Sequence, residues 1–147
     1  MKQFSFRLDS ILKYRNYIEK KAQMTLRDVR NEYMGRKNKV KRLGIKRIES
    51  VIRCRDEAIK GLNVPMYKIH QAFLLKLDHD LERADMELQE GEKKVKAQEE
   101  ILKGESIKKK ALETLKDLQL KGYMKELGQE EQKFMDEMVM IRREGKA

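Results

Sequence analysis

The chain has 147 residues, of which 41% are charged and 39% hydrophobic, and its formal net charge is +10 at pH 7. With one proline and no tryptophan, it contains few strand formers and almost no helix breakers, which favours long helices. A compact domain of this length buries roughly two-thirds of its unfolded surface, and four Phe and five Tyr are too few large apolar residues for that. We therefore predict an all-α protein with a thin core, as in a coiled coil.

Two classes of protein are excluded by the apolar residues and the cysteine count. No apolar run approaches the roughly 20 residues of a membrane span, and residues 1–12 alternate charged and aromatic side chains, unlike a signal peptide. We expect a soluble, cytoplasmic protein. Cys54 is the single cysteine, so a disulfide or a thiolate zinc site within one chain is excluded.

The strongest interruption of the helical pattern is the stretch from Gly61 to Pro65. Glycine suits the end of a helix, and proline suits the first turn of the next one. We predict one domain over residues 1–147: a first helix over about 5–61, a turn over about 62–65 and a second helix over about 66–143. This is a long antiparallel two-helix coiled-coil hairpin with a longer C-terminal arm.

Apolar residues recur at helical spacing in both predicted helices. In the first, one line has a period of eleven residues (Ile18, Val29, Val40, Val51, Leu62), and a neighbouring line has spacings of three and four (Ile45, Ile48, Ile52, Ile59, Leu62). In the second, a heptad line (Leu74, Leu77, Leu81, Ala84, Leu88, Gly91, Val95) is followed by an eleven-residue step (Ile101, Leu112, Tyr123, Phe134). Eleven residues over three turns give about 3.67 residues per turn, close to a straight helix. We expect these lines to form the seam, meaning the row of side chains that each helix turns toward the other.

A turn near residue 64 places residue n of the first helix opposite roughly residue 128 minus n of the second. Residues 1–62 contain 18 Lys and Arg and 7 Asp and Glu, a net charge of +11, so the basic excess lies in the first arm. Its densest run (Arg36, Lys37, Lys39, Lys41, Arg42, Lys46, Arg47) is predicted to face an acidic series (Asp80, Glu82, Asp85, Glu87, Glu90, Glu92). Such pairs are worth little singly, but they favour this register over slipped ones.

The second helix is about 20 residues longer than the first, so Gly128 to Ala147 has no predicted intramolecular partner. This overhang contains Phe134, Met135, Met138, Met140 and Ile141. Unpaired apolar surfaces of this kind mark interaction sites. Next to the turn, residues 66–77 are also richer in large apolar side chains than one seam requires. There, two interpretations are equally supported: Phe73 and Leu77 close the turn end of the coil, or they anchor a partner.

Nothing in the sequence indicates catalysis, a metal or a cofactor. His70 and His79 are nine residues apart, on opposite sides of a helix, and cannot share a metal ion. Phosphate-binding glycine loops and nucleophile elbows are absent, and a solvated rod has no pocket to shift a carboxylate pKa. The basic run suggests an alternative, a structural coiled coil that binds nucleic acid or serves as a homodimeric spacer. Because acidic residues should offset its field and few aromatics are available to stack on bases, we expect no specific nucleic acid, and an acidic partner protein is favoured.

Three motifs resemble the flagellar export protein FliJ family. The first is the start Phe4-x-Phe6-Arg7-Leu8-x-x-Ile11-Leu12-x-x-Arg15-x-x-x-Glu19. The second is Tyr67-x-x-x-Gln71-x-Phe73-x-x-x-Leu77 after the turn, and the third is Glu131-Gln132-Lys133-x-Met135-Asp136-Glu137. Asp80 and Arg83, charged residues just after the second motif, depart from the family pattern.

The resemblance implies a non-enzymatic component of the type III export apparatus, a hairpin similar to the central shaft of rotary ATPases. It implies that the termini enter the ring of a hexameric flagellar export ATPase through Phe4, Phe6, Arg7, Arg15, Gln132, Asp136 and Glu137. It also implies that Tyr67, Gln71, Phe73 and Leu77 bind the cytoplasmic linker of the export gate. Escort of export chaperones is a further implied role, and contact with the membrane is expected only peripherally, at its inner face, through the apparatus.

Overall fold

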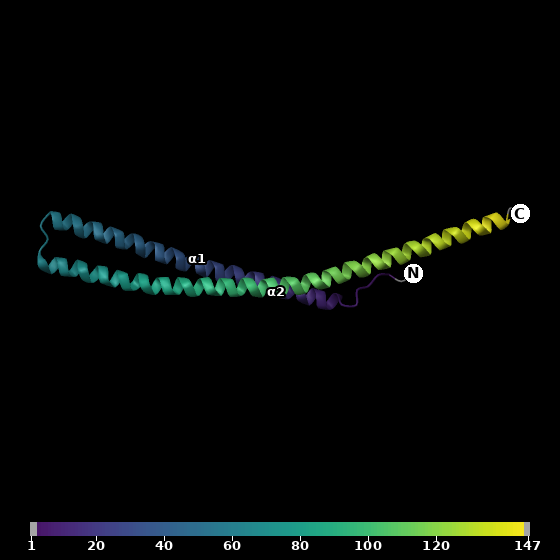
Figure 1. Ribbon diagram of the computed structural model, residues 1–147, viewed down its shortest axis with the longest axis horizontal. Helices are drawn as coiled ribbons and strands as arrows, with labels where there is room; N and C mark the ends of the chain where they lie inside the picture. Colours follow the sequence, from purple (N-terminus) through teal and green to yellow (C-terminus); the bar gives the residue numbers. More distant parts are fainter. Residues whose placement is uncertain (1–2, 146–147) are drawn as a thin grey trace. The chain divides into compact units, whose positions relative to one another are not determined.

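The computed structural model describes residues 3–145 and consists of two α-helices, α1 over Asp9–Ile59 and α2 over Val64–Gly145 (Figure 1). They pack against each other as a hairpin, and the described residues contain no strand, which confirms the predicted fold class. Over the same residues, neither helix is apolar enough to cross a membrane. The chain forms two compact units: the turn unit, Ala22–Leu102, and the terminal unit, made of the chain on either side of it.

The start of α1 differs from the prediction: it lies at Asp9 and not near residue 5. The Asp9 amide donates to the Phe6 carbonyl at 3.1 Å, and the Leu12 amide donates to the Leu8 carbonyl at 2.9 Å. The residues before Asp9 therefore make a turn. This turn buries the Phe6 side chain, which is 7% exposed. A helix beginning near residue 5 would have directed the Phe6 ring differently.

The predicted turn lies between the helices, and its residues take the expected roles. Gly61 has a φ of 96°, a left-handed conformation that glycine adopts without a steric penalty and that commonly ends a helix. The Asn63 side-chain Oδ1 accepts a 3.0 Å hydrogen bond from the Met66 amide, which caps the start of α2. Pro65 lies in the first turn of α2, where its missing amide hydrogen costs nothing.

The α1 seam has a heptad period, and the predicted line of isoleucines does not belong to it. Its covered residues follow spacings of three and four along the turn unit (Ala22, Leu26, Val29, Tyr33, Arg36, Val40, Leu43, then Ser50, Cys54, Glu57). By contrast Ile45, Ile48, Ile52 and Ile59 are 48% to 79% exposed and lie outside the seam. Their spacing identified a common face of the helix correctly. It carried no information on which face meets α2, because two faces of α1 have the same period.

The α2 seam agrees with the prediction as far as Val95. All seven residues from Leu74 to Val95 in the heptad line are buried or half-buried. The predicted eleven-residue step after them is wrong, because the covered residues keep the heptad spacing (Gln98, Leu102, Glu105, Lys109, Leu112, Lys116, Tyr123, Leu127). Leu112 and Tyr123 belong to both periods, whereas Ile101 and Phe134 are 54% and 64% exposed.

Most interhelical ion pairs agree with the predicted register to within about one helical turn, and the exception is Arg15, which reaches Glu105 where residue 113 was expected. In the turn unit, Arg30 lies 3.1 Å from Glu99, where residue 98 was expected. In the terminal unit, Glu19 lies 3.4 Å from Lys109, the residue predicted.

The predicted facing charges are mostly not paired. Among the described residues, Glu87 is the one member of the acidic series that pairs with the basic run, through Lys39 at 3.5 Å. Arg47 pairs with Asp78 instead. Lys37, Lys41 and Arg42 are exposed, and at exposed positions an ion pair gains little over hydration.

Gly91 is the place where α1 approaches α2 most tightly among the glycines of the described chain. A Cβ atom there would lie 3.3 Å from Cδ of Arg36 and 3.4 Å from Cδ2 of Tyr33. Arg36 is also held in place, since its Nη1 donates a 2.7 Å hydrogen bond to the Glu87 carbonyl. The glycine therefore lets a large polar side chain cross the seam.

We expect Gly91→Val to lower the free energy of unfolding by roughly 1–3 kcal/mol, the usual cost of overpacking a close contact. Gly35→Val is the matched control, because a Cβ at Gly35 meets nothing within 4 Å and the same substitution changes helix propensity about equally at the two positions. For this control we expect the free energy of unfolding to change by a few tenths of a kcal/mol. Thermal and urea unfolding followed by circular dichroism measures both. Equal stability of the two variants would show that the contact at Gly91 does not constrain packing.

Candidate partner-binding surfaces

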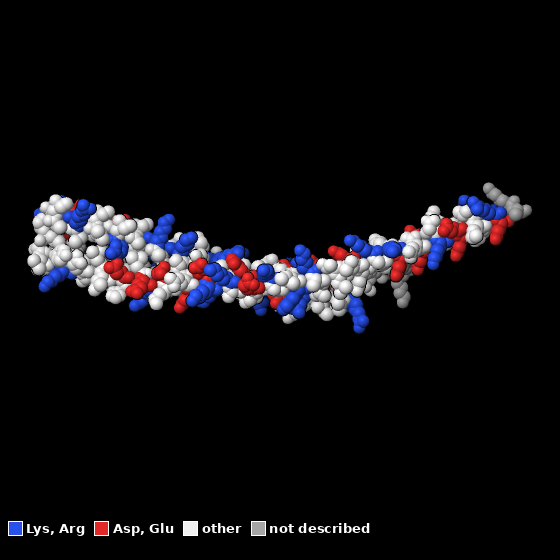
Figure 2. Space-filling view, in the orientation of Figure 1, with Lys and Arg blue, Asp and Glu red and all other residues white. Residues whose placement is uncertain are grey.

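Exposed large apolar side chains gather in two segments of the described chain. The first surrounds the turn, in the turn unit (Ile45, Ile48, Val51, Ile52, Ile59, Val64, Met66, Tyr67, Ile69, Phe73, Leu75). The second is near the end of α2, in the terminal unit (Phe134, Met135, Met138, Val139, Met140, Ile141). Figure 2 shows the first segment as a largely uncharged surface over the loop and the adjoining helix ends. These two places are the candidate binding surfaces.

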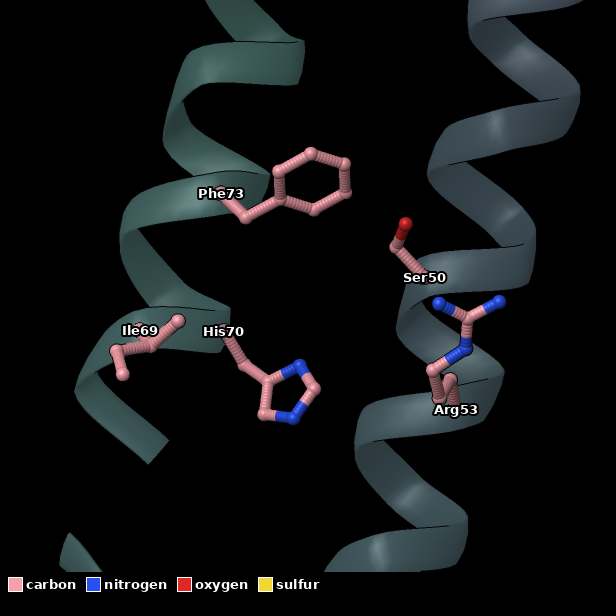
Figure 3. Close-up of a pocket in the computed structure, with 5 residues that line it drawn as sticks. All are labelled: Ser50, Arg53, Ile69, His70 and Phe73. Carbon is pink, nitrogen blue, oxygen red and sulfur yellow. The ribbon is translucent and has the colours of Figure 1, made fainter. Parts of the chain in front are cut away.

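A groove beside the turn is built from both helices. It has a volume of about 260 Å³ and is lined by Ser50 and Arg53 of α1 and by Ile69, His70 and Phe73 of α2. In Figure 3 the Phe73 ring and the His70 ring extend toward α1, while Ile69 points away from it. The Phe73 ring is 38% exposed, and the Lys46 ammonium group lies 5.7 Å from its centroid. The groove thus combines an accessible aromatic ring with cations.

His70, which lines this groove, forms a hydrogen bond with Glu57 of α1. Nε2 of His70 lies 2.6 Å from Oε2 of Glu57, and the His70 side chain is 16% exposed. Sequence reasoning considered His70 only as a metal ligand and missed this contact. The heptad spacing of α2 could have predicted a contact with α1, since His70 lies seven residues before Leu77 and so belongs to the seam.

The four residues assigned to the export gate do not form one surface. Leu77 is 2% exposed and lies in the seam, so the interpretation in which it closes the coil holds for this residue. Phe73 lines the groove described above, whereas Gln71 lines another one with Arg47 and Asp78. Residues two apart on a helix differ by about 200° around its axis, so Gln71 and Phe73 lie on different sides of α2. Tyr67 is half exposed, at 50%.

Of the four N-terminal residues assigned to the ATPase ring, three are used within the terminal unit. Phe4 packs against Tyr123 with 5.5 Å between ring centroids, and Phe6 is buried. Arg15 Nη1 lies 3.5 Å from Oε2 of Glu105, an oxygen that is itself buried and has no hydrogen bond. Arg7 is exposed and is the member of this group that can meet a partner without rearrangement.

The three C-terminal residues assigned to the ring lie on the exposed end of α2. Gln132 donates a 3.2 Å hydrogen bond to Asp136 one turn later, and Glu137 is exposed. Every residue from 128 to 145 is exposed, and Leu127 is the last half-buried one. The predicted overhang therefore begins at Gly128 as expected.

The overhang is the second candidate surface, and we call it the C-terminal surface (Phe134, Met135, Met138, Val139, Met140, Ile141). Phe134 and Met135 take part in two shallow grooves, one with Glu130 and Glu131 and one with Met138 and Arg142. Val139 was not singled out from the sequence, although it shares the spacing of Met135 and Met138. Flexible methionines around one aromatic ring suit a surface that adapts to a partner.

Asp9, the first residue of α1, has its pKa lowered below the ordinary aspartate range. The main cause is a hydrogen bond from Lys116 at 3.2 Å. Desolvation opposes it and raises the pKa, while the charges of Lys116 and Lys13 lower it further. A lowered pKa in the folded state means that the ionised carboxylate stabilises the fold. That stability is present above the pKa of the unfolded chain and is lost as the pH falls through the lower, folded value.

We expect Asp9→Asn to be less stable than the natural chain at neutral pH, and we expect the difference to shrink as the pH falls. Asparagine keeps the size of the side chain and its preference for helix starts, so the charge alone is tested. Unfolding midpoints measured between about pH 7 and pH 3 give the comparison. A difference that stays constant over this range would contradict the role of the charge.

The comparisons with known proteins identify one family. The family described as "Flagellar FliJ protein" matches residues 4–146 of the chain. No curated protein and no solved structure gives a significant match. The match spans nearly the whole sequence, including all three motifs and both candidate surfaces, so this chain belongs to the FliJ family of flagellar export components.

Proposed function

We propose that this chain is a non-enzymatic, two-helix component of flagellar type III export that binds the hexameric export ATPase through its terminal unit and the cytoplasmic linker of the export gate through its turn unit. Family membership supports a role in the export apparatus. The observation that carries the ATPase part is the C-terminal surface, where six large apolar side chains on residues 134–141 are all exposed. An apolar surface of this kind costs solubility unless a partner covers it.

A two-helix rod has no six-fold symmetry, so it contacts the subunits of a hexameric ring unequally. Unequal contacts stabilise different conformations in different subunits, which is how a bound rod promotes assembly of the ring and nucleotide turnover. The overhang of α2 is the element proposed to enter the pore, together with Arg7, Gln132, Asp136 and Glu137. Phe4, Phe6 and Arg15 are proposed to act indirectly, by holding the N-terminal segment against α2.

On the gate side, the proposal rests on Phe73 and its groove. A ring that is 38% exposed beside Lys46 and Arg53 suits a partner segment with an apolar anchor and acidic neighbours. Tyr67 is proposed to extend this contact, and Leu77 to support it from within the seam. Gln71 is proposed to make a separate contact with the linker, from its own groove on another side of α2. Escort of export chaperones is proposed as a further role, and the membrane is reached only through the apparatus.

The test is the ATPase rate of the cognate export ATPase with and without the full chain, together with sedimentation of the mixture. We expect a higher rate and a complex with one chain per hexamer. Absence of both stimulation and complex formation would overturn the ATPase part of the proposal. Binding of the purified gate linker, measured separately by calorimetry, tests the gate part.

A further inference from the structure

Four isoleucines form a continuous line on the outward face of α1 in the turn unit. Ile45, Ile48, Ile52 and Ile59 are 48%, 59%, 53% and 79% exposed. Ile52 is two residues from Ser50 and two from Cys54, both of which belong to the seam, so it lies about 200° around the helix from each of them. The line therefore faces away from α2, and none of its members lines the Phe73 groove.

The spacing of this line is that of a coiled-coil seam. Ile45, Ile48, Ile52, Arg55 and Ile59 follow steps of three, four, three and four, which is the heptad rule for residues that pack into a neighbouring helix. Four of the five positions hold β-branched isoleucine, a side chain that is stiff and well suited to such packing. α1 thus has two seams: one is covered by α2, and the other is exposed. We call the exposed one the isoleucine seam.

The surroundings of the isoleucine seam are strongly basic. Residues 37–60 contain nine Lys and Arg and three Asp and Glu, a net charge of +6. Among the described residues, Lys39 and Arg47 are paired with carboxylates of α2, and Lys46 lies over the Phe73 ring. The other six cations of this stretch form no ion pair with any residue between 3 and 145 (Lys37, Lys41, Arg42, Arg53, Arg55, Lys60). Their charge is available to a partner.

This positive charge favours one kind of binding partner for the isoleucine seam over the others. A second copy of the chain packed on the same seam in parallel would place Arg55 against Arg55, and in antiparallel orientation it would bring Lys41 and Arg42 close to Lys60. Both arrangements bring like charges together. An anionic membrane would attract the cations, but Glu49 and Asp56, next to the isoleucines, would then be held against lipid phosphates. An acidic helix can place its carboxylates opposite Lys41, Arg42 and Arg55 and uncharged residues opposite Glu49 and Asp56, whereas the surface of an anionic membrane cannot be arranged in this way.

We propose that the isoleucine seam is a docking site for an acidic amphipathic helix of another protein, which packs on α1 as the third helix of a short coiled coil. Its apolar residues, spaced three and four apart, interlock with the four isoleucines. One of its acidic residues meets Arg55 inside the interface, and others face Lys41 and Arg42 at its edge. Buried charge pairs of this kind select partner and register. This site is separate from the Phe73 groove and the C-terminal surface, and it does not depend on the proposed binding of ATPase or gate.

A synthetic probe tests the chemistry of the site on the full chain. The probe is a helical peptide of 21 residues with Ile and Leu at the seam positions and one Glu among them to meet Arg55. Its flanking positions hold Glu where they face Lys41 and Arg42, and Gln where they face Glu49 and Asp56. We expect the natural chain to bind it, and we expect Ile48→Gln with Ile52→Gln to weaken binding at least about tenfold. Met24→Gln is the matched control, since Met24 is an isolated side chain of α1 that is 60% exposed, and its binding should be unchanged.

A charge exchange separates a specific seam from general electrostatic attraction. We expect Arg55→Glu to weaken binding of the probe and to bind better a second peptide in which the seam Glu is replaced by Lys. Circular dichroism should show unchanged helix content in all variants, because every substituted side chain is exposed. Binding that is equal for all variants, or that follows net charge alone, would overturn the proposal.

The natural occupant is identified by a photo-crosslinking residue at position 52 of the full chain in its own cells, with position 24 as the control. We expect a crosslink at position 52 only, to a segment with heptad-spaced apolar residues and an acidic flank. A crosslink to a second copy of the chain, to lipid or to nucleic acid would overturn the proposal, as would the absence of any crosslink. An unchanged stimulation of the export ATPase by the Ile48→Gln, Ile52→Gln variant would confirm that the two sites are independent.

Discussion

Replacing Leu77 by alanine is expected to lower the free energy of unfolding by about 2–4 kcal/mol, the range for a buried leucine in a core that relaxes only partly. The side chain is 2% exposed and lies where the two helices meet next to the turn. Phe73→Ala is expected to cost only about 1 kcal/mol, since its ring is partly in solvent and loses mainly the contact with Lys46. Urea unfolding of the two variants gives the comparison.

The same two variants separate structure from binding at the gate surface. With both proteins fully folded at low temperature, Phe73→Ala should weaken binding of the gate linker by about tenfold or more, whereas Leu77→Ala should retain most of it. The variant Met86→Gln is a control for general loss of exposed apolar surface on α2, because Met86 is 63% exposed and lines neither the Phe73 groove nor the groove of Gln71. Equal destabilisation by Phe73→Ala and Leu77→Ala would mean that Phe73 serves the hairpin and not a partner.

The second large effect is expected at the C-terminal surface. Phe134→Glu combined with Met138→Glu places two charges one turn apart on the face that we propose to enter the ATPase ring. We expect the concentration of chain needed for half-maximal ATPase stimulation to rise by about tenfold or more, since hot-spot losses are at least about 1.4 kcal/mol. The unfolding midpoint should not change, because residues 128–145 are exposed throughout and contribute no packing to the hairpin.

The control for this variant must alter charge without removing an apolar side chain. Gln129→Glu with Lys133→Gln lowers the net charge by the same amount in the same segment. We expect it to stimulate the ATPase almost as the natural chain does. If the control loses stimulation equally, the contact is electrostatic, and the apolar interpretation of this surface is wrong.

Much of the hairpin could be predicted because the chain is locally consistent. The heptad line from Leu74 to Val95 was recognised from spacing alone, since leucine at steps of three and four leaves one face to bury. Gly61 and Pro65 predicted the turn because only a few residue types fit the end of one helix and the start of the next. Counting residues on either side of that turn then predicted the overhang at Gly128.

The errors arose where two faces of one helix compete. α1 has apolar residues of helical period on opposite sides, and the prediction assigned the eleven-residue line and the isoleucines to one seam. α2 instead covers the side that holds Ala22, Leu26, Val29 and Leu43 together with polar residues such as Arg36. The regular spacing of apolar residues predicts that they share one face of a helix. Only the position of the partner helix decides whether that face is buried or exposed.

The sequence by itself determined two helices, their antiparallel register and the free end of α2, because backbone propensity, period and length are properties of the chain alone. Only the tertiary structure decided the roles of individual residues: Leu77 packs in the seam, Phe73 lines a groove, Phe6 is buried and the isoleucines of α1 face solvent. These roles depend on which side chains the second helix covers. Covering one seam of α1 leaves the other exposed, and that exposed seam is where we expect a further protein to bind.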